Sequence, residues 1–119
     1  MEQKPKKGIT FKVLWHSEIV DDFRDIPQNI VENIIEASTY RLSQAPQLVG
    51  APLKGTTNLV WKMRFSAYRI LFTMNQKSEE VWVLSVKHRS VVYNQQNIMS
   101  VLQMAIAIHQ SGGSIKPLE

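Results

Sequence analysis

Hydrophobic and polar residues follow two different periods along the first third of the chain. Residues 9–15 alternate between apolar and polar, which is typical of a strand with one buried face. From residue 17 onward the apolar residues recur every three to four positions, the spacing of an amphipathic helix. Ser17 can cap a short helix over 17–25, and Pro27, which lacks an N–H, suits the start of a second helix that ends near residue 43. The pattern predicts a strand followed by a helical hairpin that is hinged at 25–27.

Strand-like runs return in the second half of the chain. Ala45-Pro46 breaks the second helix, and Gly50 and Gly55 mark an irregular connection. Three strands are predicted over 59–65, 68–74 and 81–87, joined as an antiparallel meander, and 81–84 is apolar on both faces like a central strand. Residues 94–109 have helical spacing and are apolar nearly all round. This last helix must be buried, either against its own sheet or against a partner.

The order β-α-α-β-β-β-α predicts an α+β fold in which the helical hairpin packs on a mostly antiparallel four-stranded sheet. The 119 residues suit a single domain, with a core over 9–93, a C-terminal helix over 94–109 and a loose tail over 110–119. The second face of the sheet and its rim would then remain available for a partner. No segment has the length of a membrane span or the pattern of a signal peptide, so we expect a cytoplasmic protein.

Composition narrows the chemistry that the chain can perform. The chain has no cysteine, which excludes thiolate catalysis, cysteine zinc sites and disulfides. His16 and His109 have no partners at metal-ligand spacing, and we expect neither a metal nor a cofactor. The net charge is +4, and residues 50–93 hold seven Lys and Arg against two Asp and Glu. Such a local excess indicates either a face that binds polyanions or a solvated surface with few acids.

Basic and aromatic residues form an ordered series within this segment. The series is Leu53-Lys54-Gly55, Trp61-Lys62-Met63-Arg64, Tyr68-Arg69-Ile70-Leu71-Phe72, Val86-Lys87-His88-Arg89 and Val92-Tyr93. With Ile26-Pro27 and Ala45-Pro46 upstream, it resembles the RelE/ParE toxin superfamily over about residues 11–93. Two features depart from that pattern: Ser66-Ala67 stands where a Gly-Asp-like turn is common, and the helix after Tyr93 is longer than the usual terminal segment.

The resemblance implies a RelE-type mRNA interferase of a type II toxin–antitoxin system. Such an enzyme cuts message on the ribosome by attack of a ribose 2′-OH on the adjacent phosphate, and a cognate antitoxin silences it. The reaction needs proton transfer and positive charge around the phosphorane but no metal. The implied partners are the antitoxin, in a hetero-oligomer, and the ribosome with its mRNA, without a membrane. Two other classes stay open: a ParE-like toxin that binds DNA gyrase without nuclease chemistry, and an inactive antitoxin-binding relative.

Eight residues of the series are candidates for this site. The predicted catalytic group is Arg64, His88, Arg89 and Tyr93, and the predicted RNA- and phosphate-binding group is Lys54, Lys62, Arg69 and Lys87. An arginine can grip a phosphate through a planar fork, a histidine can exchange protons near neutrality, and a tyrosine can stack on a base.

Five of these candidates also have an alternative interpretation. Arg64 could lie on a solvated strand face, His88 could end a sheet edge, Lys54 could be an ordinary surface lysine, and Tyr93 could pack at a strand-to-helix junction. Arg69 could tie the sheet to an acidic group or assist the basic rim, with Tyr68 in the sheet core. Trp61 and Trp82 lie in apolar strands and are predicted to be core residues.

Overall fold

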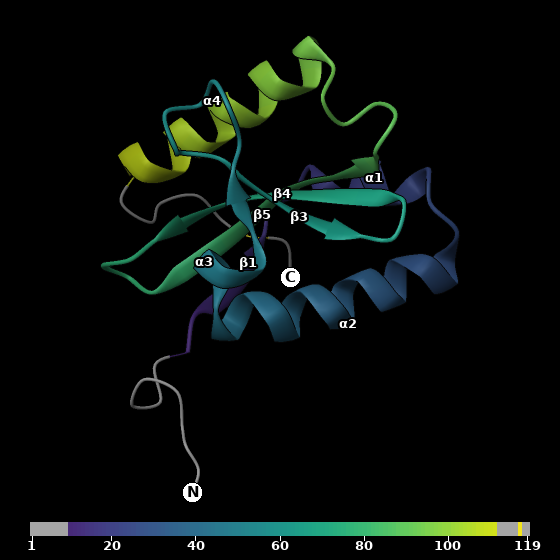
Figure 1. Ribbon diagram of the computed structural model, residues 1–119, viewed down its shortest axis with the longest axis horizontal. Coiled ribbons are helices and arrows are strands. Elements are labelled where there is room, and N and C mark those ends of the chain that lie inside the picture. Colours follow the sequence, from purple (N-terminus) through teal and green to yellow (C-terminus); the bar gives the residue numbers. More distant parts are fainter. Residues whose placement is uncertain (1–9, 112–116, 118–119) are drawn as a thin grey trace, which may run out of the picture.

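A five-stranded sheet forms the middle of the protein, with helices on both of its faces (Figure 1). The computed structural model describes residues 10–111 and 117. The strands are β1 (Lys12–Trp15), β2 (Ala51–Pro52), β3 (Trp61–Phe65), β4 (Tyr68–Asn75) and β5 (Glu80–His88), in the spatial order β1-β5-β4-β3-β2. β1 pairs in parallel with β5, and the other pairs are antiparallel. The predicted α+β class and the meander of β3, β4 and β5 are confirmed.

The helices are α1 (Ile19–Arg24), α2 (Gln28–Gln44), α3 (Pro46–Val49) and α4 (Gln95–Ser111). α2 lies along one face of the sheet and α4 along the other (Figure 1). The predicted helical hairpin therefore exists as α1 and α2, joined through Ile26-Pro27. No helix within the described residues is long and apolar enough to cross a membrane.

Several predicted details are wrong, and each has a local cause. The sheet has five strands instead of four, because the connection after α2 contributes the two-residue strand β2, which pairs with β3. Pro46 starts the short helix α3 instead of only ending α2, since proline fits the first position of a helix. Ser17 does not cap α1; instead the N–H of Glu18 donates to His16 Nδ1 at 3.2 Å.

The predicted boundaries at the two ends of the chain are met only in part. β1 begins at Lys12, and position 9, the predicted start of this strand, lies outside the described residues. α4 extends to Ser111, so positions 110 and 111 of the predicted tail are helical. Most of the remaining tail also lies outside the described residues.

Two hydrophobic clusters occupy the two faces of the sheet. The α2-side cluster joins strand residues to α1 and α2 and consists of Phe11, Ile19, Ile26, Val31, Ile34, Leu42, Met63, Ile70, Phe72, Val81, Val83 and Val86. The α4-side cluster joins the opposite strand face to α4 and consists of Leu53, Val60, Leu71, Trp82, Leu84, Val92, Val101, Ala105 and Ile108. β5 contributes to both clusters, which confirms that it is a central strand. Trp82 is buried as predicted, and Trp61 is half-buried beside the α2-side cluster.

The terminal helix packs on its own sheet. α4 buries Val101, Ala105 and Ile108, and the ring of His109 lies with Nε2 2.9 Å from Thr73 Oγ1. Because the Thr73 hydroxyl already donates to the Leu59 carbonyl at 2.7 Å, it accepts the proton of His109 Nε2. The expectation that the second sheet face stays open is therefore wrong over β4 and β5, and only the part near β3 is left uncovered by α4.

The buried hydroxyl of Ser38 offers a test of the packing of α2. Ser38 is fully buried, and its Oγ has no hydrogen-bond partner among the described residues. We expect Ser38→Ala to raise the free energy of unfolding by about 1 kcal/mol, because it removes an unsatisfied polar group and favours the helix. Urea denaturation measures the change, and Ser100→Ala on the exposed side of α4 is the control for helix propensity alone. A loss of stability relative to that control would contradict this description of the core.

Gly50 permits the close approach of β2 to the rest of the sheet. A Cβ atom at this position would lie 2.8 Å from Phe72 Cζ and 2.9 Å from the Lys62 carbonyl oxygen. We expect Gly50→Ala to lower the free energy of unfolding by about 1–3 kcal/mol through overpacking. Gln47→Ala, at an exposed position of α3, should change stability by less than about 0.5 kcal/mol. Equal denaturation midpoints for the two variants would show that β2 can move away from Phe72 without a loss of stability.

Candidate functional site

Three cations lie side by side across the ends of three neighbouring strands. Arg64 of β3 is directly opposite Arg69 of β4, and Arg69 is directly opposite Lys87 of β5. Directly opposite residues point to the same face of a sheet, here the face that also carries α4. We call Arg64, Arg69 and Lys87 the cation row. Like charges in opposite positions destabilise a sheet, so a bound anion would relieve a repulsion built into this fold.

A groove of about 350 Å³ lies beside the cation row, next to the part of the sheet that α4 leaves uncovered. Its charged and aromatic lining is Lys62, Arg64, Arg69 and Tyr93, and its remaining lining is Val49, Gly50, Ala51 and Met63. The Lys62 ammonium lies 5.8 Å from the centroid of the Tyr93 ring, within the range of a cation–π contact. No acidic residue is among the lining residues, so the groove is suited to an anionic ligand.

The local backbone holds Arg69 in its place. Its Nη1 donates to the carbonyl oxygens of Ser66 at 3.0 Å and Tyr68 at 2.9 Å. Ser66 has a φ of 55° in the two-residue turn between β3 and β4, which brings its carbonyl into reach. The idea that Arg69 ties the sheet to an acidic group is wrong, because its partners are main-chain carbonyls. The other N–H groups of the guanidinium stay available to a phosphate that enters the groove.

Arg64 and Arg89 have no side-chain partner among the described residues, and both are exposed. Arg64 lines the groove directly. Arg89 lies outside the lining, but its N–H donates to the Ala67 carbonyl at 2.8 Å. This bond continues the pairing of β4 and β5 beyond His88, and it places Arg89 beside the turn that follows Arg64.

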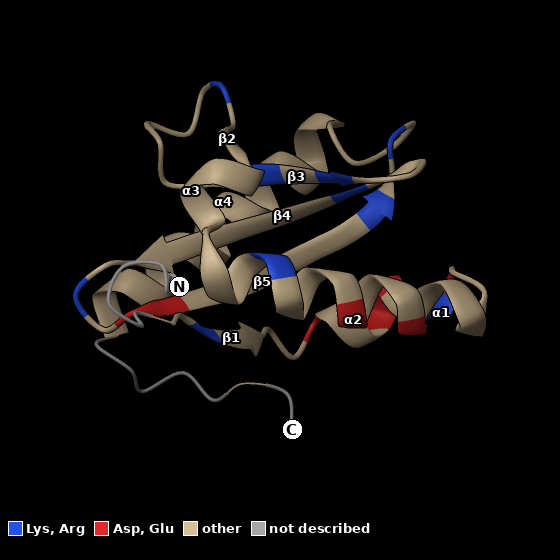
Figure 2. Cartoon of the chain, turned by 60° about the horizontal axis from the view of Figure 1, so that its bottom comes forward, with Lys and Arg blue, Asp and Glu red and all other residues tan. Residues whose placement is uncertain are grey.

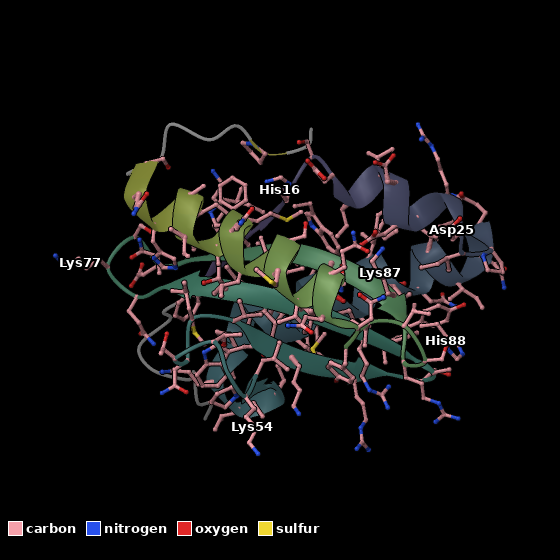
Figure 3. The ribbon with its side chains drawn as sticks, turned by 90° about the horizontal axis from the view of Figure 1, so that it is seen from above. His16, Asp25, Lys54, Lys77, Lys87 and His88 are labelled. Atoms are coloured by element: carbon pink, nitrogen blue, oxygen red, sulfur yellow. The ribbon has the colours of Figure 1, made fainter. Side chains whose placement is uncertain are left out.

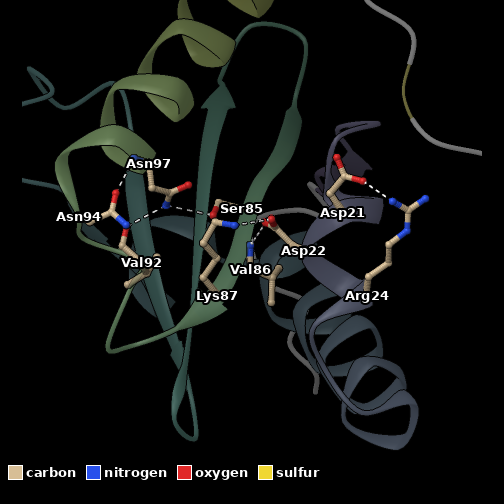
Figure 4. A network of polar contacts seen from close by, with 9 residues as sticks. All are labelled: Asp21, Asp22, Arg24, Ser85, Val86, Lys87, Val92, Asn94 and Asn97. Carbon is tan, nitrogen blue, oxygen red and sulfur yellow. Dashed lines mark hydrogen bonds and ion pairs between the residues drawn. The ribbon is translucent and has the colours of Figure 1, made fainter.

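Lys87 belongs to the cation row by position, but its side chain is engaged elsewhere. Its Nζ lies 2.7 Å from Oδ1 of Asp22, and Oδ2 of the same carboxylate accepts the N–H of Val86 at 2.8 Å (Figure 4). The side chain of Asp22 is 10% exposed and that of Lys87 is 30% exposed. Lys87 therefore does not line the groove, and its charge is neutralised by α1.

The structure does not bring His88 into the groove. His88 lies on the α2 side of β5, with its ring centroid 5.7 Å from that of Tyr68, in a hollow shared with Asp25. The N–H of Ser90 donates to His88 Nδ1 at 3.1 Å, so a neutral His88 carries its proton on Nε2. The Ser90 hydroxyl lies 2.8 Å from the same nitrogen.

Lys54 is also separate from the groove. It is exposed in the turn after Leu53, and it is not among the groove's lining residues. Figure 3 shows Lys54 and His88 at different edges of the molecule, with Lys77 at the opposite end from His88. A ligand that touches Lys54, the groove and His88 at once would have to extend across the whole edge of the sheet.

Acidic and basic residues are distributed unevenly over the protein. Figure 2 shows the acidic positions mainly on α1 and α2, whereas β3 and the end of β5 carry basic positions. The basic positions on β3 and at the end of β5 give this part of the sheet a positive field.

Sequence reasoning missed two residues that shape the site. Gly50 lines the groove and lets β2 approach, yet it was noted only as part of an irregular connection. Asp22 lies in the acidic first turn of α1, and nothing local to it indicates a partner 65 positions away.

Comparison with known proteins supports the resemblance of the sequence motifs. The chain matches no protein-family model. It is 28% identical over 74 residues to Toxin RelG of Mycobacterium tuberculosis. The matched residues are 62% of this chain and 85% of that toxin. The toxin–antitoxin complex RelBE2 of M. tuberculosis contains a chain that is similar over its full length and over 68% of this chain, with a TM-score of 0.63 and 26% identity.

The isolated E. coli toxin RelE, solved as a mutant in the free state, has a TM-score of 0.61 over 80% of this chain and 97% of its own. At 12% identity this likeness shows the fold alone. Taken with the similarity in sequence to RelG and to the RelBE2 complex, these findings show that the chain has the RelE fold and resembles the toxins of toxin–antitoxin pairs.

Proposed function

We propose that the protein is a ribosome-dependent mRNA endoribonuclease that inhibits translation in the cytoplasm. The observation that carries the proposal is the composition of the groove. It is lined by the cations Lys62, Arg64 and Arg69 and by the exposed Tyr93, without an acidic residue in its lining. A toxin that acts only by binding DNA gyrase would not need a cationic groove without acidic lining residues. The groove thus favours the nuclease over the gyrase-binding and inactive alternatives.

The residues of the groove can supply the groups that the reaction requires. In the proposed step the ribose 2′-OH gives its proton to a water molecule and its oxygen bonds to phosphorus, the bond to the 5′ oxygen breaks, and that oxygen gains a proton from a side chain of the groove. Arg64 and Arg69 would stabilise the negative charge of the phosphorane, with Arg69 already oriented by the turn. Tyr93 offers a phenolic O–H and Lys62 an ammonium N–H, and either can donate a proton to the leaving oxygen.

The remaining predicted residues would act outside the groove. Arg89 lies beside the β3–β4 turn and can bind the next phosphate of an extended message, and Lys54 can contact the strand at the other edge. His88 faces the opposite side of the sheet, so its proposed role in proton transfer is the one least supported by the geometry.

A cognate antitoxin is the proposed protein partner. The similar mycobacterial structure is itself a toxin–antitoxin complex. Since α4 is part of the core, covering the groove is a more economical way to silence the toxin than displacing α4, which would expose Leu71, Trp82 and Leu84. We propose that an acidic antitoxin segment binds over Lys62, Arg64 and Arg89 in a hetero-oligomer.

The cleavage activity can be tested in a translation extract. We expect the protein to cut a reporter message at sites seen by primer extension, and the cuts should vanish when ribosomes are omitted. Arg64→Ala and Arg89→Ala should each lower cleavage by about 100-fold or more, through the loss of a charged contact to the phosphorane or an adjacent phosphate. Lys77→Ala removes a basic residue at the far end of the sheet. It is the matched control, and this variant should cleave normally.

Two outcomes would contradict the proposal. Intact message together with inhibited DNA supercoiling would identify a gyrase-binding toxin. Intact message, normal supercoiling and tight antitoxin binding would identify an inactive relative.

The pH dependence of cleavage tests the role of His88. Because His88 lies on the face opposite the groove, we expect His88→Ala to keep the shape of the wild-type pH–rate profile, with a rate reduced by less than about 10-fold. Tyr93→Phe should instead lower the rate at every pH. If His88→Ala removes a limb of the profile near neutral pH, His88 transfers a proton and the message must pass around the end of β5.

A further inference from the structure

The position of Asp22 is fixed by the open edge of β5. β1 pairs with β5 only from Glu80 to Val83, so no strand among the described residues covers the following part of that edge. Asp22 of α1 occupies this place, and its Oδ2 accepts the N–H of Val86 at 2.8 Å. The bond holds the carboxylate at the strand edge whether or not its other oxygen has a partner.

The other oxygen of the carboxylate determines where the charge of Lys87 lies. Lys87 starts opposite Arg69 in the cation row, yet its ammonium lies 2.7 Å from Asp22 Oδ1. Its side chain lines a hollow between α1 and α4 that also contains Ser85 and Asn97, instead of the groove beside Arg69. Figure 4 shows the Lys87 ammonium between the strand and Asp22. The ion pair removes one of the three positive charges from the cation row.

We propose that Asp22 is an internal competitor for Lys87, which leaves the ion pair and binds a message phosphate when RNA occupies the cation row. This inference rests on the proposed function and adds a latent phosphate ligand to the groove. Lysine has a flexible stem and three rotatable donors, so it can turn from one acceptor to another while its backbone stays in the ladder. Without RNA, the neighbouring Arg69 repels Lys87 and favours Asp22. A phosphate between the two cations reverses that preference.

The competition predicts that a loss of the Asp22 charge strengthens RNA binding. Asp22→Asn has nearly the same size and keeps an oxygen that can accept the Val86 N–H, so the edge of β5 stays satisfied. Glu36→Gln is the matched control, because it removes one negative charge from an exposed position on α2. Lys87→Met removes the cation for which Asp22 and the RNA phosphate compete, and it keeps a long side chain.

The first measurement is the affinity for labelled single-stranded oligouridine at several KCl concentrations. At low salt we expect Asp22→Asn to bind roughly fivefold more tightly than Glu36→Gln, with a slope of log K against log salt that is steeper by about 0.7. In the Lys87→Met background Asp22→Asn should have no such effect. Affinities and slopes for Asp22→Asn that equal those of Glu36→Gln, or weaker binding, would overturn the inference.

The second measurement separates this inference from the proposed function. Acylation of Lys87, followed by mass spectrometry, should be several-fold faster in Asp22→Asn than in the wild type, and bound oligouridine should protect the residue. If oligouridine binds but leaves Lys87 reactive toward acylation, the proposed competition between Asp22 and RNA is wrong, whereas the groove is kept as the RNA-binding site. If neither the wild type nor any variant binds oligouridine at low salt, the proposed function fails together with the inference.

Discussion

Burial of β5 on both of its faces is the constraint on which the rest of the structure depends. Val81 and Val83 join the cluster under α2, and Trp82 and Leu84 join the cluster under α4. A strand covered on both sides is mostly apolar, and the charged residues of β5 occur only at its ends, although the small polar Ser85 is buried within it. Lys87 and His88 follow directly after the last buried residue of the strand. The core therefore concentrates the chemistry of this chain at one end of the sheet.

Coverage by α4 then decides which part of that end is usable. α4 lies over β4 and β5. On the same face of the sheet, Lys62 and Arg64 of β3 lie beside α4 and line the groove. Tyr93 reaches them because it lies in the segment that leads from β5 into α4, where Asn94 accepts the N–H of Asn97 and starts the helix. A helix that packs as core thus also places the tyrosine of the groove.

Local patterns predicted the long elements well and the short ones poorly. Alternation and helical spacing located β3, β4, β5, α2 and α4 to within a few residues, since these elements bury whole stripes of side chains. β2 and α3 were missed, because a two-residue strand exists only through its pairing with β3 and has no period of its own. The same limit applies to the start of α1, which has no side-chain cap: Ser17 does not cap the helix, and the N–H of Glu18 donates to His16 Nδ1.

The sequence by itself determined which side chains are available to the site and, through period-two alternation, that Lys62 and Arg64 share one face of β3. The observed pairing of β3 with β4 adds Arg69 to that face. Only the tertiary structure decided the roles of Lys87 and His88. Strict alternation from Trp82 and Leu84 would put His88 on the groove side, but the ladder skips one residue: Leu71 opposes Ser85 and Phe72 opposes Val83. That bulge shifts the parity of the strand, turning Lys87 to the groove face and His88 to the other. The docking of α1 then gives Lys87 a carboxylate 65 positions away, an interaction that depends on packing and that no local pattern encodes.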